Sequence, residues 1–499
     1  MLFRLIRWLD FPKLTFLILF LVLITLAGLG DPDYFWHLKS GEYLVSHGFP
    51  KGDPFSFTFE GRPWILHEWL FQVGLFGVFS LAGDLGVRCL TALLSTLAIY
   101  IAYRAAARLL GSTTLALVIA LAFTITTKGG FTPRPQLVTY VFFAFFIYSL
   151  VAFKYLNEDR WLWFMPPAAV LWVNGHGGYM IGLFVLGLFV ASEWIMYWIR
   201  PIKDATYRGR LSRLTVIALV SGLATAVNPE FFRHWLYPFE VMKMTTALSM
   251  IQEWQSPNFH QTTWKIFLAL VFGYLAAWTY RPAKPDLTEY LLPASMLFAG
   301  FVSVRHLPLV ALILVPFTAV ALRDSPLRPI LDRRIRQGTD LGVKGFALNW
   351  VILIVVSLVL LLPYPKLVER SNAKIEGRLP VKAAEFVRKQ GIGGRMFNGY
   401  AEGGYLIHAL YPNPQVFIDG RADLYGDQFL REFLEIYWGG PYWETLFAKY
   451  RIDFAVLPNE APIRQLLLAR GGFDTAYHDD HHSVLVRRGA AFPAASANQ

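Results

Sequence analysis

Two aspartates and a histidine stand close together after the first long apolar stretch of the chain. Asp31 and Asp33 flank a proline, and His37 follows Asp33 by four positions, which places both on one face if this segment is helical. A carboxylate near an acceptor group can take that group's proton as the acceptor attacks an electrophilic carbon. Ionisable groups near a bilayer are costly, so these residues indicate either a functional site or a local structural pair.

The same carboxylates have simpler uses. Asp31 precedes Pro32, and an aspartate before a proline is a typical start of a helix, so Asp31 could act only as an N-cap. Asp33 would complement the helix dipole, but a cap needs only one carboxylate, so capping explains Asp31 better than Asp33. As a further alternative the pair could hold a divalent cation, Mg²⁺ or Mn²⁺, because hard cations bind carboxylates.

The composition makes a membrane the solvent for most of the chain. Hydrophobic residues make up 55% and charged residues 16% of the 499 residues, and the mean hydropathy of +0.41 is too high for a soluble protein of this size. The formal net charge of +11 lies in short clusters between apolar stretches, which indicates membrane topology and not nucleic-acid binding. The single cysteine, Cys89, excludes an intramolecular disulfide and a cysteine metal site.

The basic clusters set the topology, because such clusters stay in the cytoplasm. They lie within residues 104–108, 154–160, 200–213, 281–284 and 323–344. With the N-terminus inside, all of them are cytoplasmic if the chain crosses the membrane at residues 12–29, 87–103, 113–127, 136–153, 161–175, 179–199, 214–228, 264–280, 287–303, 306–322 and 346–362. The predicted fold is a polytopic α-helical membrane domain over residues 1–362. It has an extracytoplasmic loop at residues 31–85, and residues 70–85 of this loop are expected to form an amphipathic helix at the membrane surface.

Residues 363–499 lack long apolar stretches and predict a small extracytoplasmic α/β domain. Its predicted elements are a helix at 381–389, strands at 395–398 and 415–418, a helix at 428–437, a strand at 453–457 and a hairpin at 475–478 and 483–487. The segment from Asp419 to Asp423 follows a strand and could bind a ligand, or Asp419 and Arg421 could form an internal pair that fixes the loop. Residues 478–482 could bind a metal, but a polar hairpin tip explains them with fewer assumptions.

The first outer loop resembles the GT-C class of membrane glycosyltransferases, which contains protein O-mannosyltransferases and lipid A aminoarabinose transferases. The class has an acidic motif after the first span, an interfacial helix, a Gly-aromatic stretch, and a His-Pro-Pro or Lys-Pro-Pro motif that opens a second interfacial helix. The counterparts here are Asp31-Pro32-Asp33, residues 34–47, Gly61-Arg62-Pro63-Trp64 and His67-Glu68-Trp69-Leu70. His-Glu-Trp replaces the Pro-Pro motif, so the chain would be a divergent branch.

The resemblance implies an inverting transferase that moves a hexose or pentose from a polyprenyl-phosphate donor to a lipid, glycan or protein acceptor. Transfer would take place on the outer face of the bacterial inner membrane, either without a cofactor or with the divalent cation named above. Asp33 or Asp31 would be the base. Cations at the outer ends of spans would bind the departing phosphate: Arg305, His306 and Arg134. Further outer polar residues would line the substrate pocket: His37, His67, Glu68, Asn174 and His176.

Each of these assignments has a structural alternative. An arginine at the end of a span often only anchors the helix to lipid headgroups, and the glycine-rich turn at Asn174 and His176 is often only a tight connection. Two other functions also stay open. A lipid-linked glycan transporter or flippase would need charges at mid-membrane depth, and a non-catalytic assembly protein with this fold would tolerate loss of Asp31 and Asp33.

The predicted topology can be tested by cysteine labelling in intact and permeabilised cells. With Cys89 removed, a cysteine at position 104 should react only after permeabilisation, because Arg104 belongs to a basic connector. A cysteine at position 51, in the first outer loop, is the control and should react in intact cells. Labelling of position 104 from outside would show that the topology is wrong.

Overall fold

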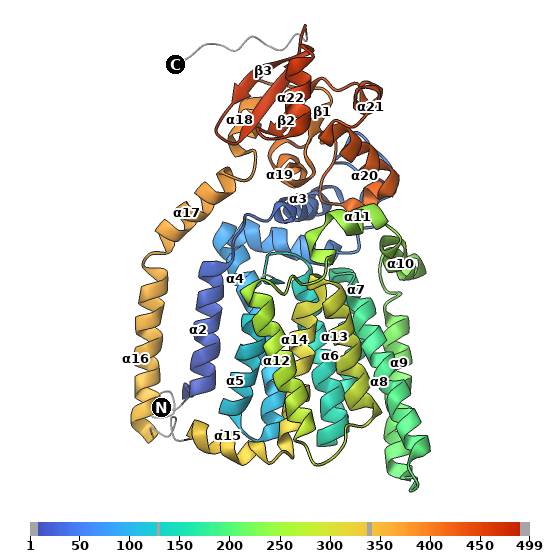
Figure 1. The fold of residues 1–499 in the computed structure, drawn as a ribbon, viewed down its shortest axis with the longest axis vertical. Coiled ribbons are helices and arrows are strands. Elements are labelled where there is room, and N and C mark those ends of the chain that lie inside the picture. Colours follow the sequence, from blue (N-terminus) through green and yellow to red (C-terminus); the bar gives the residue numbers. More distant parts are fainter. Residues whose placement is uncertain (1–7, 127–129, 337–341, 490–499) are drawn as a thin grey trace. The chain divides into compact units, whose positions relative to one another are not determined.

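The computed structural model describes residues 8–126, 130–336 and 342–489, which fold into two compact units (Figure 1). The bundle unit comprises Met1–Ala27, Leu85–Trp235 and Ile251–Tyr364. The sheet unit comprises Gly28–Asp84, Leu236–Met250 and Pro365–Gln499. The sheet unit thus joins the first outer loop, a short central segment and the C-terminal region in one packed body.

The bundle unit is built mostly from apolar helices, and the short α15 (Leu327–Arg336) is the strongly basic exception. The others are α2 (Phe11–Leu26), the second part of α4 (Trp69–Leu110), α5 (Thr113–Ile125), α6 (Gln136–Leu156), α7 (Met165–Gly175), α8 (Tyr179–Ile199), α9 (Ala205–Ala224), α12 (Thr262–Thr279), α13 (Leu287–Val302), α14 (Leu307–Arg323) and α16 (Gly342–Leu361). Every residue from Leu307 to Leu322 is buried, so α14 is the central helix of the bundle. A helix that is apolar all round needs this central position or a lipid environment.

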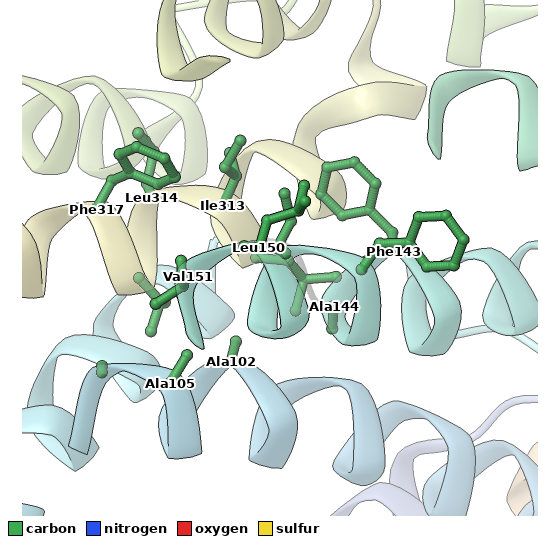
Figure 2. Close-up of a cluster of buried hydrophobic side chains, with 14 of the residues drawn as sticks. Ala102, Ala105, Phe143, Ala144, Leu150, Val151, Ile313, Leu314 and Phe317 are labelled. Atoms are coloured by element: carbon green, nitrogen blue, oxygen red, sulfur yellow. The ribbon is translucent and has the colours of Figure 1, made fainter. Parts of the chain in front are cut away.

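Small side chains allow the central helices to pack closely. Figure 2 shows α6 between α14, which contributes Ile313, and α4, which contributes Ala102 and Ala105. Alanines at such a contact let two backbones approach, which supplies packing energy where lipid removes the hydrophobic driving force. Larger side chains, such as Phe317 on α14 and Phe143 on α6, fill the remaining space.

The predicted spans all overlap helices, but the number of membrane crossings stays a prediction. Among the described residues, five helices are long and apolar enough to cross a membrane, or six if one bent pair at residues 345–376 counts as a span. Three shorter apolar helices, α2, α5 and α13, lie at other predicted spans. Helix α4 contains a break at Gly83, where φ is 55° and ψ is −147°, a conformation that glycine adopts most easily. The part of α4 before this break belongs to the sheet unit and covers most of the predicted interfacial segment.

The sheet unit contains a four-stranded sheet in the order β1-β2-β4-β3. Its strands are β1 (Met396–Asn398), β2 (Phe454–Pro458), β3 (Phe473–His478) and β4 (His482–Arg487), and only the β1 and β2 pair is parallel. Its helices are α3 (Pro32–His47), α10 (Tyr237–Met242), α11 (Thr245–Met250), α17 (Tyr364–Glu376), α18 (Val381–Lys389), α19 (Tyr400–Leu410), α20 (Ala422–Trp438), α21 (Trp443–Tyr450) and α22 (Pro462–Ala469). The sequence predicted the helix at 381–389 and the final hairpin correctly.

The predicted strand at 415–418 is wrong. This segment is buried and extended, but it makes only an isolated bridge, between Val416 and Ser56, and joins no sheet. The Asn398 side chain accepts a bond from the Phe417 amide and donates to the Ile418 carbonyl. These side-chain bonds satisfy backbone groups that a ladder would otherwise pair, so an apolar run here is buried without a sheet.

Candidate active site

The N-terminus of α3 carries both candidate bases. The Asp31 carboxylate accepts a hydrogen bond from the Asp33 amide at 3.1 Å, and Pro32 occupies the first helical turn. The capping role predicted for Asp31 is therefore confirmed. The Asp33 carboxylate accepts a hydrogen bond from the Trp36 indole at 3.2 Å. The two aspartates thus have different roles. Asp31 caps the N-terminus of α3, and the Asp33 carboxylate is held by the Trp36 side chain one turn later.

Helix α19 packs directly on α3 at Gly404 and on residues 418–419 at Gly403, because neither glycine carries a side chain. A Cβ on Gly404 would collide with the Pro32 carbonyl oxygen, and a Cβ on Gly403 would collide with the Ile418 carbonyl oxygen. The resulting close approach buries most of the first turns of α3, including Tyr34 and Trp36. The C-terminal region therefore forms part of the surroundings of Asp33.

Glu68 lies between two histidines. Its carboxylate oxygens are 3.4 Å from His67 Nε2 and 3.6 Å from His37 Nδ1. His37 Nδ1 also lies 3.2 Å from the side-chain nitrogen of Gln72, and the Tyr237 hydroxyl lies 3.4 Å from His67 Nε2. Three of the residues predicted to line a pocket, His37, His67 and Glu68, are thus brought together within the sheet unit.

The electrostatics of this cluster favour a protonated His67. Burial disfavours the imidazolium, but the neighbouring Glu68 carboxylate, and farther away Asp423, outweigh burial and raise the pKa of His67. The His67 imidazole and the Glu68 carboxylate thus form a buried pair that offers hydrogen-bond donors and acceptors. Such a pair can orient a polar substrate group or exchange a proton with it.

A second buried cluster lies around Arg421, which is 1% exposed. Its guanidinium is 2.6 Å from Asp53 and 2.7 Å from Asp419, and the Tyr425 hydroxyl donates to Asp419 at 2.6 Å. Burial raises the pKa of Tyr425, and the Asp419 charge raises it further, so the hydroxyl keeps its proton. The predicted internal pair of Asp419 and Arg421 is therefore confirmed, with Asp53 as an additional partner.

Two of the three candidate phosphate-binding residues, Arg305 and His306, lie on a short turn of the bundle unit, η5 (Val304–His306), which contacts a second short turn, η4 (Gln252–Trp254). The Arg305 guanidinium lies 5.0 Å from the centre of the Trp254 ring, and the His306 ring also contacts that tryptophan. Arg134 forms an ion pair with Glu253 at 3.0 Å. Across the described ranges no ion pair with a carboxylate is found for Arg305.

Asn174 and His176 tie helices of the bundle unit together. Asn174 donates to the carbonyl oxygens of Val170 and Val227, both at 2.8 Å. The Nδ1 atom of His176 lies 2.7 Å from the Thr139 hydroxyl and accepts from the Gly178 amide at 3.0 Å. These bonds match the tight connection considered for this turn, and a role in a substrate pocket stays a prediction.

No group of three or more His, Cys, Asp or Glu residues in the described part of the chain is arranged to hold a metal ion. At the hairpin between β3 and β4, the Asp479 carboxylate accepts from the amides of His481 and His482, so the predicted polar hairpin tip is present. Binding of a divalent cation by Asp31 and Asp33 stays a prediction.

Sequence reasoning missed several residues of these clusters. Gln72 of α4 follows Glu68 by four positions, and Glu68 immediately precedes this helix, so helical spacing alone could have indicated it. Tyr237 and Asp53 gave no such signal, because their partners His67 and Arg421 are 170 and 368 positions away. In the sequence Gly420 is one residue of a loop, and no pattern there indicates that it contacts Asp33.

Comparisons with known proteins identify the fold. No protein-family model and no protein of curated function matches the sequence. Among solved structures, the chain is similar to ArnT from Cupriavidus metallidurans bound to undecaprenyl phosphate, with 15% identity and a TM-score of 0.52 over 95% of this chain and 97% of that chain. It is also similar to the oligosaccharyltransferase AglB from Archaeoglobus fulgidus in complex with an inhibitory peptide and a dolichol-phosphate, with 13% identity and a TM-score of 0.54 over 89% and 69% of the two chains. Both are GT-C glycosyltransferases, so the chain has the fold that its first outer loop predicted.

The buried charge cluster can be tested by replacing Arg421 with methionine. The variant should lose about 3–5 kcal/mol of stability, because Asp53 and Asp419 would remain as buried carboxylates without a counter-charge. Thermal unfolding of the purified protein in detergent measures the loss. Arg431→Met is the matched control, since this α20 side chain is 63% exposed and makes only a long, 4.0 Å contact with Asp427. Equal unfolding temperatures for both variants would contradict the assignment.

Proposed function

We propose that the protein is a membrane glycosyltransferase that transfers a sugar from a polyprenyl-phosphate donor to a hydroxyl or amine acceptor. The GT-C fold supports this class of reaction, and the solved structures of this fold named above contain polyprenyl phosphates. The observation that carries the proposal is the Asp33 carboxylate, held at the start of α3 by the Trp36 indole while Asp31 caps the helix.

In the proposed reaction, Asp33 takes the proton of the acceptor as the acceptor atom attacks the anomeric carbon. The bond between the anomeric carbon and the phosphate oxygen breaks, and the polyprenyl phosphate leaves with the bonding electrons. This single displacement inverts the configuration at the anomeric carbon. The His67 and Glu68 pair is proposed to orient the acceptor, because it offers a donor and an acceptor beside α3.

Arg305 is proposed to bind the departing phosphate, with His306 and Arg134 in support. Its guanidinium rests on the Trp254 ring, and a stacked arginine keeps its hydrogen-bond donors available at the edges of the plane. The ion pair of Arg134 with Glu253 brings a second cation to η4, but Glu253 partly neutralises its charge. Arg305 is therefore the stronger candidate.

A transporter would place charges at mid-membrane depth. In the described part of the bundle unit, several buried charges pair with one another, and the buried Arg88 donates to the Ala27 carbonyl oxygen. Lys154 contacts Glu193 and Asp286, and Arg281 contacts Glu289. This pattern favours the transferase over the transporter.

The base is tested by replacing each aspartate with asparagine. Asp33→Asn should reduce sugar transfer about a hundredfold to ten-thousandfold while donor binding persists, because the amide keeps the shape but takes no proton. Asp31→Asn should be milder, because asparagine caps a helix almost as well. A reconstituted transfer assay with a radiolabelled lipid-linked sugar measures both.

Wild-type activity of Asp33→Asn would remove the proposed base. If both single variants are inactive and a chelator abolishes wild-type transfer, the two aspartates are metal ligands instead. Transfer that resists chelation while Asp33→Asn is inactive supports the base.

The donor site is tested by replacing Arg305 with alanine. Loss of charge-assisted bonds to the phosphate should weaken binding of polyprenyl phosphate roughly tenfold to hundredfold. Tryptophan fluorescence can follow this binding in detergent. Arg233→Ala is the control, because this arginine of the same unit is 61% exposed and contacts Glu230. Unchanged affinity of Arg305→Ala would assign Arg305 to helix anchoring.

A further inference from the structure

The turn Asp419-Gly420-Arg421 lies directly against the Asp33 carboxylate. A Cβ on Gly420 would collide with Asp33 Oδ1, and it would lie 3.1 Å from Asp33 Cγ and 3.3 Å from the Trp36 indole nitrogen. The φ of Gly420 lies outside the left-handed region, so glycine is needed here for space and not for its backbone conformation. The absence of a side chain at position 420 lets the turn approach Asp33.

The turn itself is held firmly on both sides of Gly420. Arg421 Nε and its backbone amide donate to Asp419 Oδ1 at 2.8 and 3.0 Å. The Tyr400 hydroxyl donates to the Gly420 carbonyl at 3.1 Å, and the Ala422 amide donates to the same oxygen at 3.0 Å. A buried turn with this many bonds has one conformation, so it offers Asp33 a fixed neighbour.

Arg421 also links the first outer loop to Asp33 through aromatic rings. Its guanidinium lies 4.5 Å from the centre of the Trp64 ring, and that ring lies 6.4 Å from the ring of Trp36. Trp36 in turn donates its indole N–H to Asp33. The Asp33 carboxylate is thus fixed by the turn on one side and by the hydrogen bond from Trp36 on the other.

We propose that the turn Asp419-Gly420-Arg421 positions the Asp33 carboxylate for proton transfer, so that the C-terminal region completes the base of the active site. Gly420 and Arg421 are positioning residues in this view, because they act through Asp33. The proposal rests on the proposed function only for the role of Asp33 as the base. It gives the C-terminal region a direct part in the reaction.

Gly420→Ala tests the proposal in the full-length protein. The colliding atom is the end of a side chain, so the carboxylate should move while the fold persists. A displacement of about 1 Å can lower a rate about a hundredfold, so kcat should fall by this order while KM for the donor stays unchanged. The acid limb of the pH–rate profile should move to higher pH, because the displaced carboxylate loses the Trp36 hydrogen bond that favours its ionised form.

Gly472→Ala is the matched control. This glycine also belongs to the sheet unit, but a methyl group added to it would have nothing within 4 Å, and its φ is not left-handed. The control should keep the wild-type rate and pH profile. A wild-type rate for Gly420→Ala, with Asp33→Asn inactive, would overturn the positioning role and leave the base in place.

A double-variant cycle separates the contact from the catalytic role. Thermal unfolding of Gly420→Ala, Asp33→Ala and their combination should show that removal of the Asp33 side chain cancels any loss caused by the added methyl. The unfolding measurement tests the contact between Gly420 and Asp33 even if Asp33→Asn proves active and Asp33 is not the base. Strictly additive effects on unfolding, together with unchanged transfer, would show that Gly420 does not act through Asp33.

Discussion

The burial of one arginine between two aspartates determines how the sheet unit is organised. Arg421, Asp53 and Asp419 come from two distant parts of the sequence, and all three are almost fully buried. Removing charges from water is costly, and the cost is offset only when the geometry lets each charge find its partners. The first outer loop and the C-terminal region must therefore meet in one specific way, since any other arrangement leaves a buried charge unpaired.

This requirement explains the glycines around the cluster. Gly403, Gly404 and Gly420 all lie where a side chain would collide with α3 or with the turn that holds Arg421. Close approach of backbones brings Asp33 next to a turn whose conformation the ion pair has already fixed. Apolar contacts alone would allow several arrangements with similar burial, whereas directional bonds to charged groups select one of them.

The sequence predicted those parts of the structure that depend on local interactions. The Asp31 cap, the helix at 381–389 and the final hairpin follow from residues a few positions apart, so pattern and propensity suffice. The strand at 415–418 was predicted wrongly, because an apolar run indicates burial but not the partner that satisfies its backbone. That partner is the side chain of Asn398 together with residues of the first outer loop.

The candidate site could be predicted only in part for the same reason. The resemblance of the first outer loop indicated Asp31, Asp33, His67 and Glu68, and the last two do form a cluster with His37. No pattern indicated that Asp53 would pair with Arg421 or that Gly420 would touch Asp33. These contacts join segments more than 350 positions apart, and a single sequence carries no signal for them.

The departure from the GT-C motif now has a physical explanation. A Pro-Pro pair at the start of a helix fixes the chain through restricted backbone torsions. In this chain the Gln72 amide donates to the Glu68 carbonyl as α4 begins, and the Glu68 carboxylate lies between His67 and His37 of α3. The start of α4 is therefore fixed to α3 by buried charge and not by proline rings. Because this cluster and Asp33 belong to the same helix pair, the substitution that makes the motif divergent also places one further titratable group, Glu68, next to the helix that carries the proposed base.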